Sequence, residues 1–391
     1  MEELYGCTPA TACPPFGNFW QSSRLWPSSV RARSARRRWR LNWFTAELYP
    51  QTVMLRELGA PLSAAKLAFV STAAVRACDT LHLGFLLDPL ACRYDPMRDA
   101  AVLCVGVAGN GVVGTSTSAA CVKLAEATTM NKIWYGQTAD GNAADPQVDN
   151  GSEPHLPSDG HLWYGLTRGT GLCLLAGTNP FTIATDLVAL ELQDPTYAQP
   201  NLVNATGNGS NRWKTLDYAG LANAYYQGLA LQRPFSRINT DLADLEELRE
   251  EGTKVLSYHG LADDLIMPMN SIHYFTRVVA ANGKVAKVHR FNRLFLIPGL
   301  AHDGSFGRSA SLDPASGAPT SVNKVPLPQP STGRDELFVA LRNWVELGVA
   351  PSRIEVSSAN GSVTMPLCLY PAKAVYQGIG PVTASSSYTC N

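Results

Sequence analysis

Two short apolar runs, each followed by a glycine-containing loop, mark residues 254–304. Apolar runs of this length, bounded by turn residues, are typical of buried parallel strands. The loop after the first run contains Asp263, and the loop after the second contains His302, 39 residues later. A helix is predicted between them, over Ser271–Ala281. The segment is therefore predicted to fold as strand, acid, helix, strand, histidine.

This order matches the second half of an α/β-hydrolase triad, in which the nucleophile comes first, then the acid, then the histidine. The Gly-x-Ser-x-Gly elbow that should precede the pair is absent from the sequence. Each residue also has a simpler interpretation. Asp263 is equally expected as a helix cap or turn residue, and His302 as an ordinary loop residue.

Helical periodicity predicts further elements on both sides of this segment. Residues 46–55 and 62–77 are expected to form helices, and Ser63 is expected to cap the second. Residues 335–346 are expected to form an amphipathic helix, and the tail from Pro351 onward is rich in predicted strands.

Composition divides the chain into four predicted segments. Between Cys78 and Leu242 it is rich in Gly, Asn, Thr and aromatic residues, which favours short elements and long loops, as in a lid inserted into a hydrolase. The fold class expected is α/β, an incomplete α/β-hydrolase fold with an inserted lid domain. The predicted segments are a core remnant at 1–77, the lid at 78–242, core with the acid and histidine at 243–350, and a C-terminal wrap at 351–391.

Residues 4–46 contain seven arginines but no Lys, Asp or Glu. The run has neither helical nor strand periodicity, and residues 4–41 are expected to be irregular. A basic arm for nucleic acid, a solvated disordered segment, and translation in a shifted reading frame around residues 8–41 are three interpretations. Reading the coding DNA in the other two frames tests the third.

The chain of 391 residues is 45% apolar and carries 32 basic and 32 acidic residues. This is enough apolar sequence for a sizeable core, and the balanced charge argues against a nucleic-acid partner. No apolar run reaches the roughly 18 residues of a membrane span. The N-terminus lacks the features of a signal peptide.

Nine cysteines and four Asn-x-Ser/Thr sequons favour an oxidising, secretory origin. The pairs Cys78/Cys92, Cys104/Cys121 and Cys368/Cys390 are spaced for disulfides that close short loops. The sequons begin at Asn150, Asn204, Asn208 and Asn360.

Several stretches of the sequence resemble the tannase/feruloyl esterase family of α/β-hydrolases. The resemblance implies hydrolysis of esters of phenolic acids, such as feruloyl or galloyl esters, by a secreted serine esterase. The expected partner is a small aromatic ester or a plant cell-wall phenolic ester, with no nucleic acid and no membrane. The stretches that carry the resemblance are Asn42–Pro50, Ala77–Asp79, Asp88–Cys92, Lys132–Gly136, Tyr258–Asp263, Leu296–His302 and Pro366–Pro371.

The resemblance also assigns roles to individual residues. Asp263 becomes the triad acid, His302 the general base, and Thr8 stands at the position of the nucleophilic serine. Pro9 follows and has no N–H with which to hold an oxyanion. The central strands expected before the elbow are missing, so the chain is expected to be N-terminally incomplete. The alternative is a catalytically inactive fragment or pseudoenzyme that retains only the lid and ligand cleft.

Two further expectations come from the resemblance. Members of the family usually hold a structural calcium ion, and Asp79 is the only acidic ligand that remains in the corresponding loop. The lid aromatics Trp134, Trp163 and Tyr164 are candidates for stacking on the acyl group, or for lid core.

Overall fold

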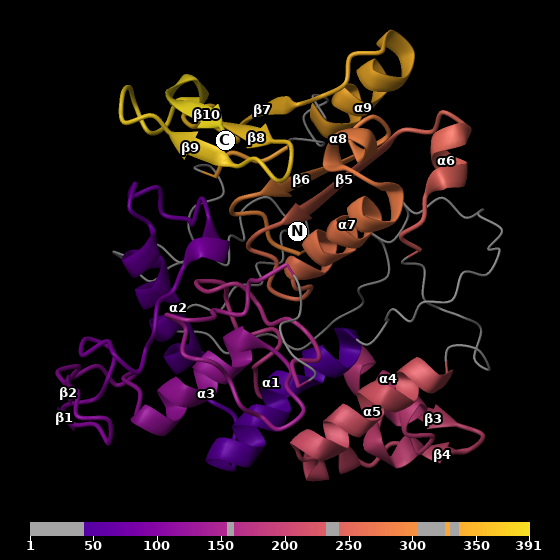
Figure 1. Ribbon diagram of the computed structural model, residues 1–391. Helices are drawn as coiled ribbons and strands as arrows, with labels where there is room; N and C mark the ends of the chain where they lie inside the picture. Colours follow the sequence, from indigo (N-terminus) through magenta and orange to yellow (C-terminus); the bar gives the residue numbers. More distant parts are fainter. Residues whose placement is uncertain (1–42, 155–159, 232–241, 303–324, 329–335) are drawn as a thin grey trace.

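The computed structural model describes residues 43–154, 160–231, 242–302, 325–328 and 336–391. Figure 1 shows the orange and yellow part of the chain, which includes β5, β6 and α7, above an indigo, magenta and pink part that extends to α5. Thr8 and the arginine-rich run lie outside the described residues.

The centre of the upper half is a parallel pair of strands. β5 (Val255–Gly260) pairs with β6 (Asn292–Ile297), in register from Val255 opposite Asn292 to Gly260 opposite Ile297. The connection between them contains α7 (Met269–Asn282) and the short α8 (Val285–Val288). This strand, helix, strand unit confirms the α/β class. Because the strands are parallel, the loops after them emerge at the same edge.

The two strands differ in burial. β6 is mostly buried, as expected, whereas β5 is only half-buried and Tyr258 is 52% exposed. Among the described residues β5 pairs along one edge alone, which explains its greater exposure. The expectation of two buried strands is therefore wrong for β5.

The C-terminal tail forms antiparallel hairpins that cover β6. A hydrophobic cluster joins Phe295 and Ile297 of β6 to Val356 and Leu367 of the tail. The strands predicted from Pro351 onward are thereby confirmed, and the assignment of 351–391 as a wrap of the core stays a prediction. The strands are β7 (Arg353–Ser357), β8 (Thr364–Cys368), β9 (Ala374–Tyr376) and β10 (Tyr388–Cys390).

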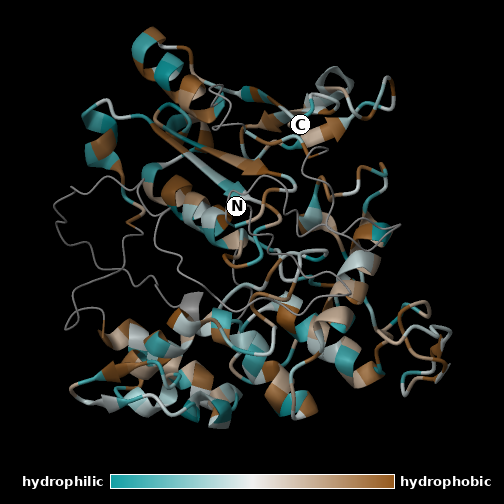
Figure 2. Cartoon of the chain, turned by 180° about the vertical axis from the view of Figure 1, so that it is seen from behind, coloured by the Kyte–Doolittle hydropathy of each residue, from teal (hydrophilic) through white to brown (hydrophobic). Residues whose placement is uncertain are grey.

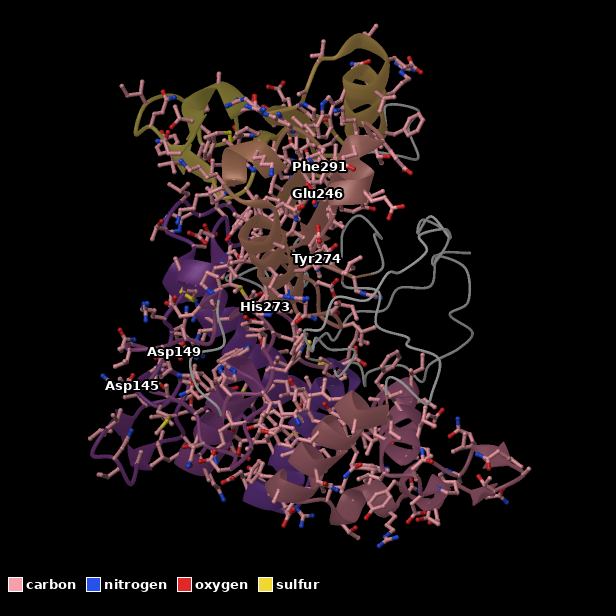
Figure 3. The ribbon with its side chains drawn as sticks, turned by 45° about the vertical axis from the view of Figure 1, so that its right-hand side comes forward. Asp145, Asp149, Glu246, His273, Tyr274 and Phe291 are labelled. Atoms are coloured by element: carbon pink, nitrogen blue, oxygen red, sulfur yellow. A yellow bond between two sulfur atoms is a disulfide. The ribbon has the colours of Figure 1, made fainter. Side chains whose placement is uncertain are left out.

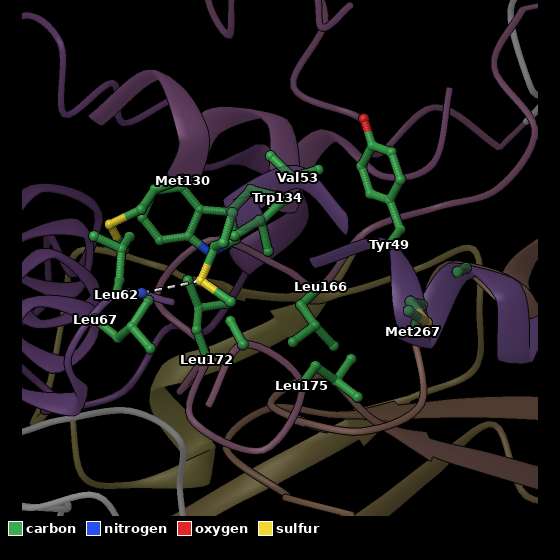
Figure 4. Packing of buried hydrophobic residues seen from close by; sticks show 14 of the residues in the cluster. Tyr49, Val53, Leu62, Leu67, Met130, Trp134, Leu166, Leu172, Leu175 and Met267 are labelled. Carbon is green, nitrogen blue, oxygen red and sulfur yellow. Dashed lines mark hydrogen bonds between the residues drawn. The ribbon is translucent and has the colours of Figure 1, made fainter. Parts of the chain in front are cut away.

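The lower half is organised around α1 (Trp43–Leu58), which is buried over most of its length. Figure 4 shows Tyr49 and Val53 of α1 in the cluster that also contains Trp134 and Leu172. This cluster extends to Met267, just before α7, so it joins the two halves of the molecule. The helices packed against α1 are α3 (Leu124–Tyr135), α4 (Thr182–Glu191) and α5 (Tyr218–Leu231).

The remaining predicted helices form close to their expected positions. α2 (Ala64–Cys78) begins after Ser63, whose Oγ accepts a hydrogen bond from Lys66 N at 3.4 Å. α9 (Glu336–Leu347) is amphipathic, and the helices are banded brown and teal in Figure 2. No helix of the described ranges is long and apolar enough to cross a membrane. The small elements are β1 (Gly106–Val107), β2 (Val113–Gly114), β3 (Val203–Asn204), β4 (Gly207–Asn208), α6 (Glu246–Glu250) and four single turns of 3₁₀ helix.

Covalent bonds support the loop-rich parts of the fold. Disulfides join Cys78 to Cys92, Cys104 to Cys121, and Cys368 to Cys390, which confirms the three pairs expected from spacing. The segment boundaries at 77/78, 242/243 and 350/351, and the lid assignment itself, stay predictions. The largest core crosses the first of these boundaries, because α1 packs directly on helices of the 78–242 segment.

Candidate active site

Asp263 lies in a tight turn directly after β5. Its backbone N–H donates to the carbonyl of Gly260, and Ala262 N donates to Leu300 O at 3.1 Å in the loop after β6. A Cβ atom on Gly260 would lie 2.2 Å from that same Leu300 oxygen, so only glycine permits this approach. The loops that carry the acid and the histidine are thus held in direct backbone contact.

The Asp263 carboxylate is buried, and backbone donors hold one of its two oxygens. Its Oδ1 accepts backbone hydrogen bonds from Leu265 N at 3.0 Å and Ile266 N at 2.7 Å. Asp263 is therefore a turn residue, as its simpler interpretation holds. These two backbone hydrogen bonds use Oδ1, and other partners contact Oδ2.

His302 contacts this carboxylate across the gap between the two loops. Its Nδ1 lies 3.3 Å from Oδ1 and 3.3 Å from Oδ2 of Asp263. The His302 side chain is 33% exposed, whereas that of Asp263 is 8% exposed. A buried carboxylate beneath a partly exposed imidazole is the arrangement that orients a general base. With Nδ1 directed at the acid, Nε2 is the ring nitrogen that exchanges the proton in an arrangement of this kind.

A second histidine also contacts Asp263 and was not singled out from the sequence. His259 Nε2 lies 3.2 Å from Asp263 Oδ2, and its Nδ1 lies 2.7 Å from the Oγ of Ser271 on α7. The signal available in the sequence was the spacing of His259 and Asp263, four residues apart at the end of a strand.

The charges around Asp263 favour its ionised form. Burial raises the pKa of this carboxyl, but hydrogen bonds from His259 and His302 outweigh burial and hold the pKa well below its ordinary value. Asp263 is thus a permanent anion at neutral pH, able to stabilise an imidazolium. The pKa of Glu47 on α1 is shifted in the opposite direction. Burial, and to a smaller extent the negative charge of Asp263, raise it well above the ordinary value.

Comparison with known proteins identifies the family. A family model described as tannase and feruloyl esterase matches residues 38–391. The chain belongs to this family. The match confirms the resemblance inferred from the sequence and covers all of the described residues.

Curated proteins from bacteria and fungi are moderately similar to this chain. An uncharacterized esterase of Xanthomonas campestris pv. campestris is 26% identical over 366 residues, 88% of this chain and 57% of that protein. A probable feruloyl esterase B-1 of Aspergillus oryzae is 28% identical over 326 residues, 81% of this chain and 50% of that protein. The chain therefore spans about half of the length of these curated relatives.

Solved structures share the fold. Feruloyl esterase B from Aspergillus oryzae superposes with a TM-score of 0.61 at 24% identity, covering 90% of this chain and 62% of that one. Tannin acyl hydrolase from Aspergillus niger superposes with a TM-score of 0.60 at 18% identity, covering 90% and 58%.

The aromatic side chains expected in the lid are core residues. Trp134 is 1% exposed, Trp163 6% and Tyr164 1%. The Tyr164 hydroxyl lies 3.0 Å from Nδ1 of His273, which α7 places at the junction of the two halves (Figure 3). Of the two interpretations offered by the sequence, lid core fits these residues, because no face of their rings is open to a ligand.

A small cavity lies beside the acid loop, and a buried arginine that was not predicted from the sequence forms part of its wall. Its lining includes Arg168, Thr170 and the residues Leu261 and Ala262 just before Asp263. Burial lowers the pKa of Arg168 to about 10, and its guanidinium donates to Asn131 Oδ1 at 3.1 Å. The cavity brings one cation close to the acid loop.

Asp79 does not offer a calcium site in this fold. Its carboxylate accepts backbone hydrogen bonds from Leu83 N at 3.0 Å and Gly84 N at 2.7 Å. The described part of the chain holds no group of three or more His, Cys, Asp or Glu side chains that could bind a metal ion. Since Ca²⁺ takes six to eight oxygen ligands, these residues do not fit the ion that the resemblance implies.

Proposed function

We propose that the protein is a carboxylic ester hydrolase acting on aromatic esters of phenolic acids, such as feruloyl or galloyl esters. The observation that carries this proposal is the contact of His302 Nδ1 with Asp263 at 3.3 Å, at the shared edge of two parallel strands. Membership of the tannase and feruloyl esterase family supports the reaction class. The names of its relatives support feruloyl esters as substrates.

In the proposed mechanism, His302 acts as the general base. Its Nε2 takes the proton of the nucleophilic hydroxyl as that oxygen attacks the ester carbonyl. Asp263 holds the ring through Nδ1 and stabilises the imidazolium that forms. His302 then protonates the departing alcohol, and water releases the phenolic acid in a second step.

The hydroxyl expected to attack is that of Thr8, which stands where the family has serine. Its extra methyl group restricts rotation about χ1. Pro9 removes one N–H that would stabilise the oxyanion, a loss that costs about 100- to 1000-fold in rate. We therefore propose that ester hydrolysis by this chain is slow.

These two residues also favour a second candidate, a protein that binds phenolic esters without hydrolysing them. Such a protein would bind the ester in the same cleft as the proposed enzyme, and its Asp263–His302 pair would have no catalytic role. The disulfides seen among the described residues support a secreted protein for either candidate, since such bonds persist in oxidising compartments.

The test is release of ferulic acid from methyl ferulate, and of gallic acid from methyl gallate, by the full chain and by His302→Ala. We expect wild-type release that falls at least about 100-fold in the variant, since a base contributes 10²- to 10⁴-fold. Release that His302→Ala leaves unchanged contradicts the mechanism. Binding of methyl ferulate without release supports the second candidate.

A further inference from the structure

We propose that His259, oriented by Ser271, is a positioning residue that fixes the carboxylate of Asp263 for His302. The inference rests on the proposed function and adds a fourth and a fifth side chain to its machinery. Neither residue would touch the ester. Both would act through the acid.

The contacts of Asp263 divide between its two oxygens. Backbone donors hold Oδ1, from Leu265 at 3.0 Å and Ile266 at 2.7 Å. His259 Nε2 is the side-chain donor that holds Oδ2, at 3.2 Å, apart from His302 itself. Rotation about the Cβ–Cγ bond moves both oxygens together, so a donor at Oδ2 adds to the restraint that the backbone donors place on Oδ1. Anchors at both oxygens fix the plane that His302 Nδ1 meets at equal distances.

The tautomer of His259 follows from its neighbours. Its Nε2 faces two acceptors, Asp263 Oδ2 at 3.2 Å and the Ile266 carbonyl at 3.2 Å, so this nitrogen carries a proton. In the neutral ring Nδ1 is then an acceptor, and the Ser271 hydroxyl, 2.7 Å away, donates to it. The opposite tautomer would turn a lone pair toward the carboxylate. The two acceptors at Nε2 therefore set the tautomer, and the Ser271 hydroxyl, which can donate to Nδ1, holds the ring in the orientation that places Nε2 against Asp263.

The fold supplies both residues from rigid elements. His259 is the next-to-last residue of β5, and its side chain is 11% exposed, whereas its neighbour Tyr258 points outward. Ser271 lies in the first turn of α7. The chain of hydrogen bonds thus runs from helix to strand to acid loop to the general base.

The distinguishing experiment uses two replacements of His259 in the full chain. His259→Phe keeps a ring and removes the donor, whereas His259→Gln keeps an N–H donor at the distance of Nε2. We expect kcat for methyl ferulate to fall about tenfold in the Phe variant, as for loss of one hydrogen bond to a charged group. KM should change less than twofold, and the Gln variant should recover part of kcat.

A spectroscopic readout makes the inference independent of turnover. In ¹⁵N-histidine-labelled protein, the Nδ1–H resonance of His302, assigned through His302→Gln, reports its hydrogen bond to Asp263. We expect this resonance to move upfield or broaden in His259→Phe and in Ser271→Ala, and to be retained in Ser271→Thr, which keeps the hydroxyl. His289 follows α8 and precedes β6, so it lies at the opposite end of that strand from His302. His289→Gln therefore serves as the control and should leave the resonance unchanged.

Each outcome has one meaning. An unchanged resonance in both His259→Phe and Ser271→Ala, in protein that circular dichroism shows to be folded, overturns the positioning role. A resonance that shifts in the variants, while the wild-type chain releases no ferulate or gallate, supports the positioning role and overturns the proposed function. A His259→Phe variant that fails to fold leaves the decision to Ser271→Ala, whose unchanged resonance then overturns the inference.

Discussion

At the scale of residues, two buried carboxyl groups, Asp263 and Glu191, have pKa values shifted in opposite directions. Asp263 is buried with donors on both oxygens, so it stays charged. Glu191 of α4 is buried with no hydrogen-bond partner for Oε2, and burial raises its pKa to about 9. The difference lies in the partners and not in the depth of burial.

Glu191 should make stability depend on pH. Its folded pKa exceeds the ordinary value of 4.5, so its contribution is fully present below about pH 4.5 and is lost as pH rises toward 9. Glu191→Gln removes this titration. We expect the free energy of unfolding of the variant to rise, relative to that of wild type, by on the order of 1 kcal/mol per pH unit between about pH 4.5 and 9.

Urea unfolding at pH 5, 7 and 9 measures this gain, and Glu346→Gln on the exposed face of α9 reports the effect of the same change at the surface. A stability difference for Glu191→Gln that stays constant across the three pH values would refute the assignment.

The limits of prediction at this scale are visible in His259 and His302. His302 was predictable because a strand and a glycine-containing loop precede it at the expected distance from Asp263. The role of His259 depends on Ser271 and Ile266, which reach it only once α7 has packed beside β5. The position of Arg168 beside the acid loop was not predictable for the same reason, because four separate segments of the chain line its cavity.

At the scale of elements, the parallel pair β5–β6 sets the distance between acid and base. The loops after the strands touch at Gly260 and Leu300, where an added Cβ would meet a backbone oxygen at 2.2 Å. Backbone cannot move aside as a side chain can. This contact therefore transmits any change in Gly260 to both Asp263 and His302.

Gly260→Ala should separate the two loops. We expect a loss of about 1–3 kcal/mol in unfolding free energy, as for overpacked sites, and a fall in ester hydrolysis larger than the loss of folded protein explains. Gly109→Ala is the matched control, because its Cβ would lie 3.4 Å from Leu124 Cδ2, which is ordinary contact. Equal behaviour of the two variants in thermal unfolding and activity would show that the contact does not set the geometry.

The positions of the main helices along the chain were predictable, whereas the burial of strand β5 was not. Periodicity placed α1, α2, α7 and α9 to within a few residues, since each buries a face that its sequence marks as apolar. The exposure of β5 was not foreseen, because an apolar strand sequence says nothing about how many neighbours pair with it.

At the scale of the whole molecule, one core joins residues that the sequence assigns to separate segments. α1 packs against α3, α4 and α5, and the same cluster reaches Met267 before α7. Packing between segments far apart in the chain leaves no periodic signal. The sequence could therefore indicate a change of composition at Cys78 but not the packing across it.

Removal of divalent cations should leave this molecule unaffected. Asp79 is occupied by two backbone donors, and no metal-binding group of side chains exists in the described ranges. We expect the same melting temperature in EGTA and in calcium chloride, measured by differential scanning calorimetry. A fall in EGTA that added calcium reverses would show that a calcium site is present.

The four sequons should be used unequally if the chain passes through a secretory pathway. Asn204, Asn208 and Asn360 are exposed, whereas Asn150 is buried and its Nδ2 donates to Leu90 O at 2.8 Å and Cys92 O at 2.9 Å. We expect peptide mass spectrometry of secreted protein to find glycans at exposed sites and none at Asn150. A glycan on Asn150 in folded protein would be incompatible with this packing.

The central claim is that Asp263 and His302 act as one catalytic unit, and a double-mutant cycle on kcat/KM for methyl ferulate tests it most directly. Residues that act as a unit lose their function together, so effects of their removal do not multiply. We predict that Asp263→Asn and His302→Ala each lower kcat/KM by at least about 100-fold, and that the double variant is no slower than His302→Ala alone. Losses that multiply, or single variants as active as wild type, would contradict the claim.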